Sequence, residues 1–234
     1  MKFINLLIIF ISSNAICQNK ADSLLALGNE KQNKNEINEA IVLYNEAINI
    51  NGQNPEAYYY RGNAYFDLKD YKKAVADYNT CLSINPKHIH ALFNKANSNF
   101  ELADYKNALS GFDEVLKLDP SNSNALFDRA NTYFKLEELN KAIDDFNQGL
   151  TLSPNEANAH YDRANTYFQL DKFEQALIDY KKAIELDNNN SNYYFNKAIT
   201  EFNLEMLEDG CKDLQTSSGL GDKEADKYFI ELCQ

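Results

Sequence analysis

The feature of this chain that most limits its fold is a repeat of 34 residues. Three columns of small or aromatic residues keep this spacing through six periods. The first column is Gly28, Gly62, Ala96, Ala130, Ala164 and Ala198. The second is Ala40, Ala74, Ala108, Ala142, Ala176 and Gly210. The third is Tyr44, Tyr78, Phe112, Phe146, Tyr180 and Leu214. A fixed period of this length indicates a stack of supersecondary units rather than one globular core, and favours an extended binding surface over catalysis.

One repeat contains two stripes of apolar residues at helical spacing. In residues 124–154 the first stripe includes Leu126 and Tyr133, and the second begins at Ala142. The segment between them, residues 136–139, breaks the pattern. Pro154 ends the second stripe, because proline cannot continue a helix. We therefore predict two short helices in each repeat, whose apolar faces are buried when neighbouring repeats stack.

The residues within a repeat resemble a known family. One repeat reads Tyr58-x-x-Arg61-Gly62-x-x-Tyr65, then Ala74-x-x-x-Tyr78, then Pro86. This pattern resembles the tetratricopeptide (TPR) repeat. The resemblance covers about residues 21–218 and implies an all-α fold, a right-handed α-solenoid of six helix-turn-helix repeats. The predicted solenoid domain, 18–234, consists of repeats at about 21–54, 55–88, 89–122, 123–156, 157–190 and 191–221, and a capping helix at 222–232.

Some positions depart from the family pattern. The chain has no tryptophan, and Lys31 and Asn99 occupy the tyrosine position of the first and third repeats. The sixth repeat has Glu201, Gly210 and Ser217 where Tyr, Ala and Ala are expected. Terminal repeats of a solenoid are normally atypical because one side meets water.

The first 17 residues predict a secretory signal peptide. Lys2 precedes an apolar run at residues 3–11, which is too short to span a bilayer, since that takes about 20 residues. We expect cleavage after Cys17, or alternatively after Ala15, and a periplasmic or extracellular protein. Lipidation of Cys17 is a further alternative, although Ile16 is bulky for a lipoprotein signal. A buried first helix is disfavoured because this segment lies outside the repeat register.

Composition and motifs argue against several functions. A formal charge of −12 disfavours nucleic-acid binding, which needs clusters of basic residues, and agrees with a long solvated face. The sequence has no glycine-rich phosphate loop and no nucleophile–base motif. His88 and His90 form a weak metal signal without further ligands, and His160 lies in a core column. We predict no enzyme activity, no catalytic residue, no metal site and no cofactor.

Three cysteines follow the predicted signal peptide. Cys81 lies in a column of small residues and is predicted to be a buried, inert thiol. If the last helix packs antiparallel to its neighbour, Cys233 returns toward Cys211, and a disulfide is plausible in an oxidising compartment. The alternative is two unrelated thiols.

The first helix of each repeat carries a second face that is a candidate binding site. Its central column is asparagine, at Asn29, Asn63, Asn97, Asn131 and Asn165. Aromatic residues occur four positions earlier and three positions later, which places them on the same face. They are Tyr59, Phe93, Phe127, Tyr161, Phe66, Phe100, Phe134 and Phe168. In the family that the chain resembles, this face is the concave groove. Asparagine amides can pair with an extended peptide backbone, and aromatic rings can hold its side chains. The alternative is that the aromatic residues only pack against the neighbouring repeat.

Two charged columns accompany this face. The basic column is Arg61, Lys95, Arg129, Arg163 and Lys197, and the acidic one is Asp77, Asp145, Asp179 and Asp213. We expect ion pairs within each repeat, with an anion-binding track as the alternative. The Lys/Arg clamp by which some TPR domains bind a C-terminal carboxylate is absent. The sequence thus predicts an exported TPR scaffold that binds a protein or peptide. The alternative is a structural subunit or a self-associating module of an envelope complex.

Overall fold

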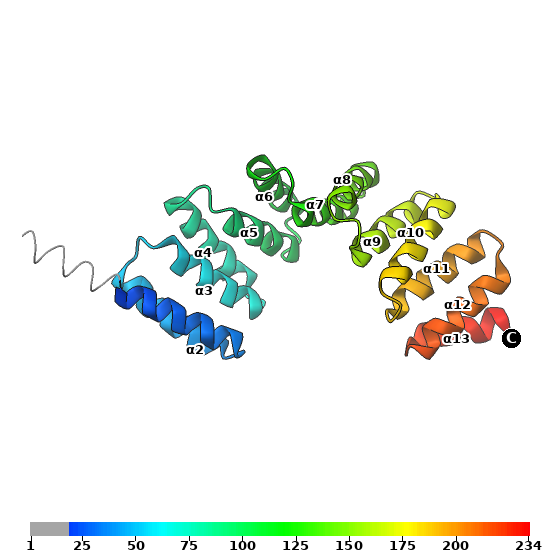
Figure 1. The fold of residues 1–234 in the computed structure, drawn as a ribbon, viewed down its shortest axis with the longest axis horizontal. Coiled ribbons are helices and arrows are strands. Elements are labelled where there is room, and N and C mark those ends of the chain that lie inside the picture. Colours follow the sequence, from blue (N-terminus) through cyan, green and yellow to red (C-terminus); the bar gives the residue numbers. More distant parts are fainter. Residues whose placement is uncertain (1–18) are drawn as a thin grey trace, which may run out of the picture. The chain divides into compact units, whose positions relative to one another are not determined.

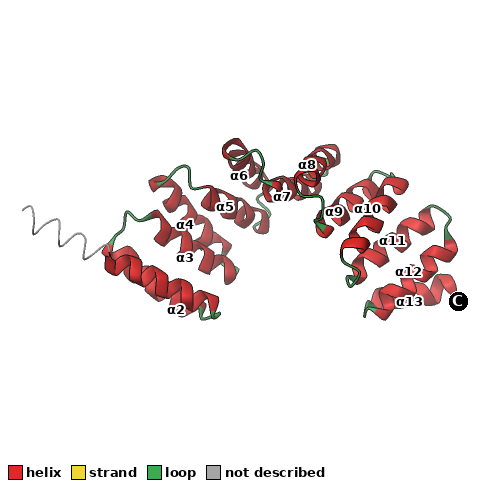
Figure 2. Cartoon of the chain, in the orientation of Figure 1, coloured by secondary structure: helices red, strands yellow, loops and turns green. Residues whose placement is uncertain are grey.

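The structure, a computed structural model, describes residues 19–234 as helices joined by short loops, with no β-strand among them (Figure 2). The predicted signal peptide, residues 1–17, lies outside these described residues. None of the described helices combines the length and the apolar character that crossing a membrane requires.

The helices follow one another in pairs (Figure 1). The chain divides into an N-terminal half, through Leu118, and a C-terminal half, Asp119–Gln234, which we describe separately. The N-terminal half contains the helical residues 19–33 with α2 (Ile37–Ile50), α3 (Pro55–Asp67) with α4 (Tyr71–Ile84), and α5 (Ile89–Glu101) with α6 (Tyr105–Leu118). The C-terminal half contains α7 (Ser123–Lys135) with α8 (Leu139–Leu152), α9 (Ala157–Gln169) with α10 (Phe173–Leu186), α11 (Ser191–Asn203) with α12 (Leu207–Gly219), and α13 (Lys223–Cys233). The predicted fold of six helix pairs and a C-terminal helix is confirmed.

Helix starts and turns follow local chemistry. Before α3, the Asn54 side chain accepts a hydrogen bond from the Glu56 backbone N–H at 3.0 Å, and Pro55 occupies the first helical position. Inside each pair, the turn contains one residue in the left-handed region, with φ between 55° and 62°. These residues are Asn35, Lys69, Ala103, Glu137, Asp171 and Glu205. The left-handed residue reverses the chain so that the second helix packs back on the first.

The tyrosine/phenylalanine column forms the core, as predicted. Tyr78 and Phe146 are completely buried, and so are Ala74 and Ala142. A residue larger than glycine would clash at position 62, because a Cβ built on Gly62 would lie 2.7 Å from Cε1 of Tyr78. The small columns thus mark the places where a helix meets an aromatic ring or the neighbouring backbone.

Candidate functional site

Where the core column is tyrosine, its hydroxyl is bonded to the asparagine column. The hydroxyls of Tyr44, Tyr78 and Tyr180 each donate to a first-helix asparagine of the same repeat at 2.7 Å. The accepting residues are Asn29, Asn63 and Asn165. Burial raises the pKa of Tyr78 and Tyr180, so both hydroxyls stay protonated and donate. The asparagine amide oxygens are therefore occupied inside the repeat.

A second polar column joins successive repeats. The Asn94 amide donates to the Asn63 oxygen at 2.8 Å, and the Asn196 amide donates to the Asn165 oxygen at 3.0 Å. In the equivalent contact the Asn131 amide donates to the Asp162 carboxylate at 3.1 Å. Burial raises the pKa of Asp162, and the bond from Asn131 opposes the rise.

Sequence reasoning did not find this second column. Its signal is an Asn or Asp residue 31 positions after each of the last four asparagines, three residues short of one period. In three contacts the partner is Asn94, Asp162 or Asn196. Asn29, Asn63, Asn131 and Asn165 are thus bonded within the fold. What Asn63 and Asn165 can still offer to a ligand is their amide N–H groups, because their oxygens each accept two bonds.

The predicted aromatic residues have packing partners as well. Phe66, Phe100 and Phe168 each meet, edge to face, an aromatic ring at the start of the following helix, with centroids 5.2–5.6 Å apart. Phe93 lies 5.9 Å from Phe112 in the same manner. Phe93 belongs to the column four positions before the asparagines. In the same column Phe127 is buried, and the ring centroids of Tyr59 and Tyr161 lie 4.8 Å from His88 and 4.9 Å from Tyr193.

Several of the predicted residues border pockets. In the C-terminal half, Phe134, Asn165 and Phe168 line one pocket of about 420 Å³. Gln169, Tyr180 and residues from α11 and α13 complete it. In the N-terminal half, Asn63 lines a polar pocket of about 400 Å³ together with Asn29, Gln32, Asn33, Tyr60 and Asp67. The candidate site is therefore this first-helix face, described separately in each half.

Four of the five basic-column residues form the predicted ion pairs. Arg61 and Asp77 are joined by two hydrogen bonds of 2.7 Å each, and the same two-bond geometry joins Arg129 to Asp145 and Arg163 to Asp179. Lys197 contacts Asp213. Burial acts to raise the pKa of Asp179, but His160 and Arg163 outweigh it and hold the pKa below its usual value.

The sixth repeat contains an additional buried acid. Glu201 is 1% exposed and stands where the family pattern has tyrosine. Lys197 donates to Glu201 Oε1 at 2.6 Å, while Glu201 Oε2 is buried without a hydrogen-bond partner among the described residues. Burial raises the pKa of Glu201 to about 7, against the opposing effect of Lys197.

The histidines have structural partners. Nδ1 of His88 accepts a bond from the Ala91 backbone N–H at the start of α5, and Nε2 lies 3.2 Å from Glu56. His160 lies between Asp179 and the Pro154 carbonyl oxygen, at 3.1 and 3.0 Å. Within residues 19–234, no group of three or more His, Cys, Asp or Glu side chains is arranged to hold a metal ion.

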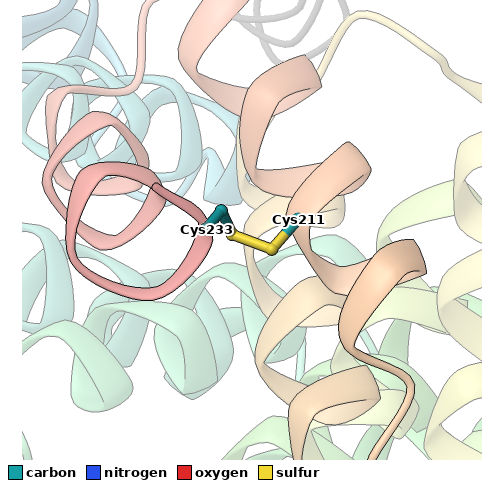
Figure 3. Close-up of a disulfide and its surroundings, with 2 residues drawn as sticks. All are labelled: Cys211 and Cys233. Carbon is teal, nitrogen blue, oxygen red and sulfur yellow. A yellow bond between two sulfur atoms is a disulfide. The ribbon is translucent and has the colours of Figure 1, made fainter.

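Figure 3 shows Cys211 on α12 joined to Cys233 on α13. Their Cα atoms are 5.7 Å apart, within the range that disulfides require. Cys81 is completely buried, and burial raises the pKa of its thiol to about 12, which keeps it protonated and unreactive.

Helix pairs that stack through a small/aromatic core, with a polar and aromatic face on the first helix, define the class of helical-repeat solenoids. Family models described as Tetratricopeptide repeat match residues 55–88, 89–122, 112–144 and 157–190. A family model described as TPR repeat matches residues 28–69 and 130–171. These matches run from residue 28 to residue 190 without a gap. The chain therefore belongs to the tetratricopeptide repeat family, as the sequence predicted.

Solved structures with the same fold are distant in sequence. PilF of Pseudomonas aeruginosa is 16% identical with a TM-score of 0.79, and the match covers 92% of this chain and 99% of that one. MamA of Desulfovibrio magneticus RS-1 is 24% identical with a TM-score of 0.69, covering 72% and 96%. YrrB, described as a TPR protein with an unusual peptide-binding site, is 18% identical with a TM-score of 0.67, covering 81% and 98%. A comparison with curated proteins gave no match.

Proposed function

We propose that this chain is an exported TPR scaffold that binds an extended peptide or a partner protein on the first-helix face of its repeats. The observation that carries the proposal is the pocket of about 420 Å³, because three residues of the predicted face, Phe134, Asn165 and Phe168, line it together. The shared fold with YrrB, which is described as having a peptide-binding site, supports it.

The hydrogen bonds specify what such a ligand must provide. The oxygens of Asn63 and Asn165 accept bonds from tyrosine hydroxyls and from the next repeat, so the amide N–H groups are what these side chains have left for a ligand. An N–H group pairs with a carbonyl oxygen, and every residue of an extended peptide carries one. We therefore expect the peptide backbone to supply acceptors and its side chains to occupy the spaces between aromatic rings.

Peptide selection tests this proposal. Peptides selected on the full-length protein from a library of short random sequences should bind more weakly to an Asn165→Asp variant, because the carboxylate keeps the acceptor for Tyr180 but removes the N–H donors. Ile178→Ala is the matched control, since Ile178 is 68% exposed on α10 and lies outside this pocket. Failure to select any peptide, or equal binding by Asn165→Asp, would overturn the proposal.

Export is a separate part of the proposal. The basic start and the short apolar run of residues 1–17 support it, and so does the disulfide between Cys211 and Cys233, because disulfides persist mainly in oxidising compartments. Cell fractionation followed by N-terminal analysis should find the protein outside the cytoplasm, beginning at Gln18 or Ile16. Recovery of an intact Met1 would contradict export by cleavage.

Self-association is a second candidate function. Ile230 and Leu232 on α13 are 57% and 55% exposed, so two apolar side chains of this helix face solvent. A second copy could cover them. Sedimentation equilibrium should then show mass rising with concentration, and replacing both residues by lysine should abolish the rise.

A further inference from the structure

The capping helix forms part of the pocket in the C-terminal half. Glu224 and Tyr228 of α13 line it, together with Phe195 and Asn196 of α11 and Asn165 of α9. Glu224 and Tyr228 are four residues apart on one helix, so they lie on the same side of α13. The pocket therefore includes a wall that comes from outside the repeated binding face.

The hydrogen bonds in this pocket leave two acceptor groups, the Asn196 oxygen and the Glu224 carboxylate, on the side of α11 and α13. The Asn196 amide nitrogen donates to the Tyr161 hydroxyl at 2.7 Å and to the Asn165 oxygen at 3.0 Å, so both of its N–H groups are used. Within the described part of the chain, the Asn196 oxygen has no hydrogen-bond partner, and the Glu224 carboxylate has no ion-pair partner. Glu224 is the one charged side chain among those that line the pocket.

Aromatic rings form the apolar part of the same pocket. Phe195 and Tyr228 meet at an interplanar angle of 86° with centroids 5.5 Å apart, so two ring faces form a corner. Phe168 of α9 adds a third ring to the lining. Aromatic rings that surround a space attract alkylammonium and guanidinium groups through the negative potential of the ring faces, and a nearby carboxylate strengthens that attraction.

We infer that this pocket binds the cationic side chain of a lysine or arginine in the partner segment. The aliphatic stem lies against Phe168, Phe195 and Tyr228, and the charged group reaches the Glu224 carboxylate and the Asn196 oxygen. Charge complementarity supports this ligand over an acidic or apolar one, because the chain carries a formal charge of −12 and attracts basic segments from a distance. The inference rests on the proposed function and names a ligand class for one part of the groove.

Two small probes test this inference. The full-length ¹⁵N-labelled protein is titrated with Nα-acetyl-lysine amide and with Nα-acetyl-norleucine amide, which have equally long aliphatic stems and differ by the ammonium group. The lysine probe should shift the resonances of the Asn165 and Asn196 side-chain amides and bind about fivefold more tightly than the norleucine probe. Glu224→Gln should remove this preference.

Glu231→Gln is the matched control. Glu231 also lies on α13 and is exposed, but it does not line the pocket, so this variant should keep the preference for lysine. Equal binding of the two probes, no binding of either, or an unchanged preference in Glu224→Gln overturns the inference. The proposed function survives these results if peptides selected on the protein still depend on Asn165, and it fails independently if they do not.

Discussion

Asn165 belongs both to the core hydrogen bonds and to the lining of the candidate pocket. Its oxygen accepts from the buried Tyr180 hydroxyl, and the residue is one of those that line the pocket. Sequence reasoning placed this asparagine on the binding face but could not assign its oxygen to Tyr180. The two residues are 15 positions apart on different helices, and their contact depends on how the helices pack.

Removing the Asn165 side chain should destabilise the protein. Asn165→Ala leaves the Tyr180 hydroxyl buried without this acceptor, so the free energy of unfolding should fall by about 1–3 kcal/mol. In a Tyr180→Phe background the same substitution should cost about 1 kcal/mol less. Urea unfolding of the wild type, the two single variants and the double variant measures this coupling. Strictly additive effects would contradict it.

Glu201 should make stability depend on pH. Its pKa rises from 4.5 in the unfolded chain to about 7 in the fold, because burial and the nearby Asp213 carboxylate raise the pKa more than Lys197 lowers it. The folded state therefore binds the proton more tightly. The contribution of Glu201 to stability is fully present below pH 4.5 and is lost as the pH rises through about 7, by about 1–3 kcal/mol.

Glu201→Gln tests this pH dependence. The amide stays neutral at every pH, while the pair between Lys197 and Asp213 remains. The variant should be more stable than the wild type at about pH 8, and the difference should shrink on acidification toward about pH 5. Thermal unfolding across this range measures it, with exposed Glu208→Gln as the control for loss of one negative charge. A constant difference at all pH values would contradict the assignment.

At the scale of the element, the turn inside each helix pair repeats with the same period as the helices. Its left-handed residue recurs every 34 positions from Asn35 to Glu205, and none of the six is glycine. The sequence predicted where these turns lie. It could not predict the left-handed position, because no column of glycine marks it.

Glycine at these turns should stabilise the protein. A left-handed conformation is strained for a residue with a Cβ, and Ala103 has φ 57°. Ala103→Gly should therefore raise the free energy of unfolding by about 0.5–1 kcal/mol, whereas the β-branched Ala103→Val should lower it. Chemical denaturation of both variants provides the measurement. A loss of stability in Ala103→Gly would mean that the entropy of glycine in the unfolded chain outweighs the strain.

The disulfide should hold one element in place. Cys211 and Cys233 are 22 residues apart, and closing such a loop stabilises the fold by about 3 kcal/mol in the chain-entropy account. Replacing both cysteines by serine should increase amide hydrogen exchange in α13 much more than in α9, because solenoid helices depend mainly on their neighbours. Cys81→Ser is the control, since it changes a thiol outside this pair. Unchanged exchange in α13 would contradict a stabilising role.

At the scale of the whole chain, the sequence predicted the contacts within each repeat but not the hydrogen bonds between successive repeats. The helix pairs, the buried aromatic column and the pairs such as Arg61–Asp77 followed from residues within one repeat. The bonds from Asn94 and Asn196 to the preceding repeat did not, because they depend on the stacking geometry. Likewise, the contribution of Glu224 to the pocket depends on where the last helix packs.

Because each repeat packs mainly on its neighbours, a core substitution should destabilise nearby helices more than distant ones. Ala142 is completely buried on α8 among Phe127, Phe146 and Leu150. Ala142→Leu adds three carbon atoms to this packed cluster and should lower the free energy of unfolding by about 1–3 kcal/mol. The distribution of this destabilisation distinguishes a stack from a single core.

In a single globular core, hydrogen exchange would increase in every helix. In a stack, hydrogen exchange should increase in α7, α8 and α9 and much less in α3 and α4. Ala76→Leu on the exposed side of α4 is the control and should change stability by no more than about 0.5 kcal/mol. Uniform acceleration of exchange in all helices would show that the chain unfolds as one cooperative body.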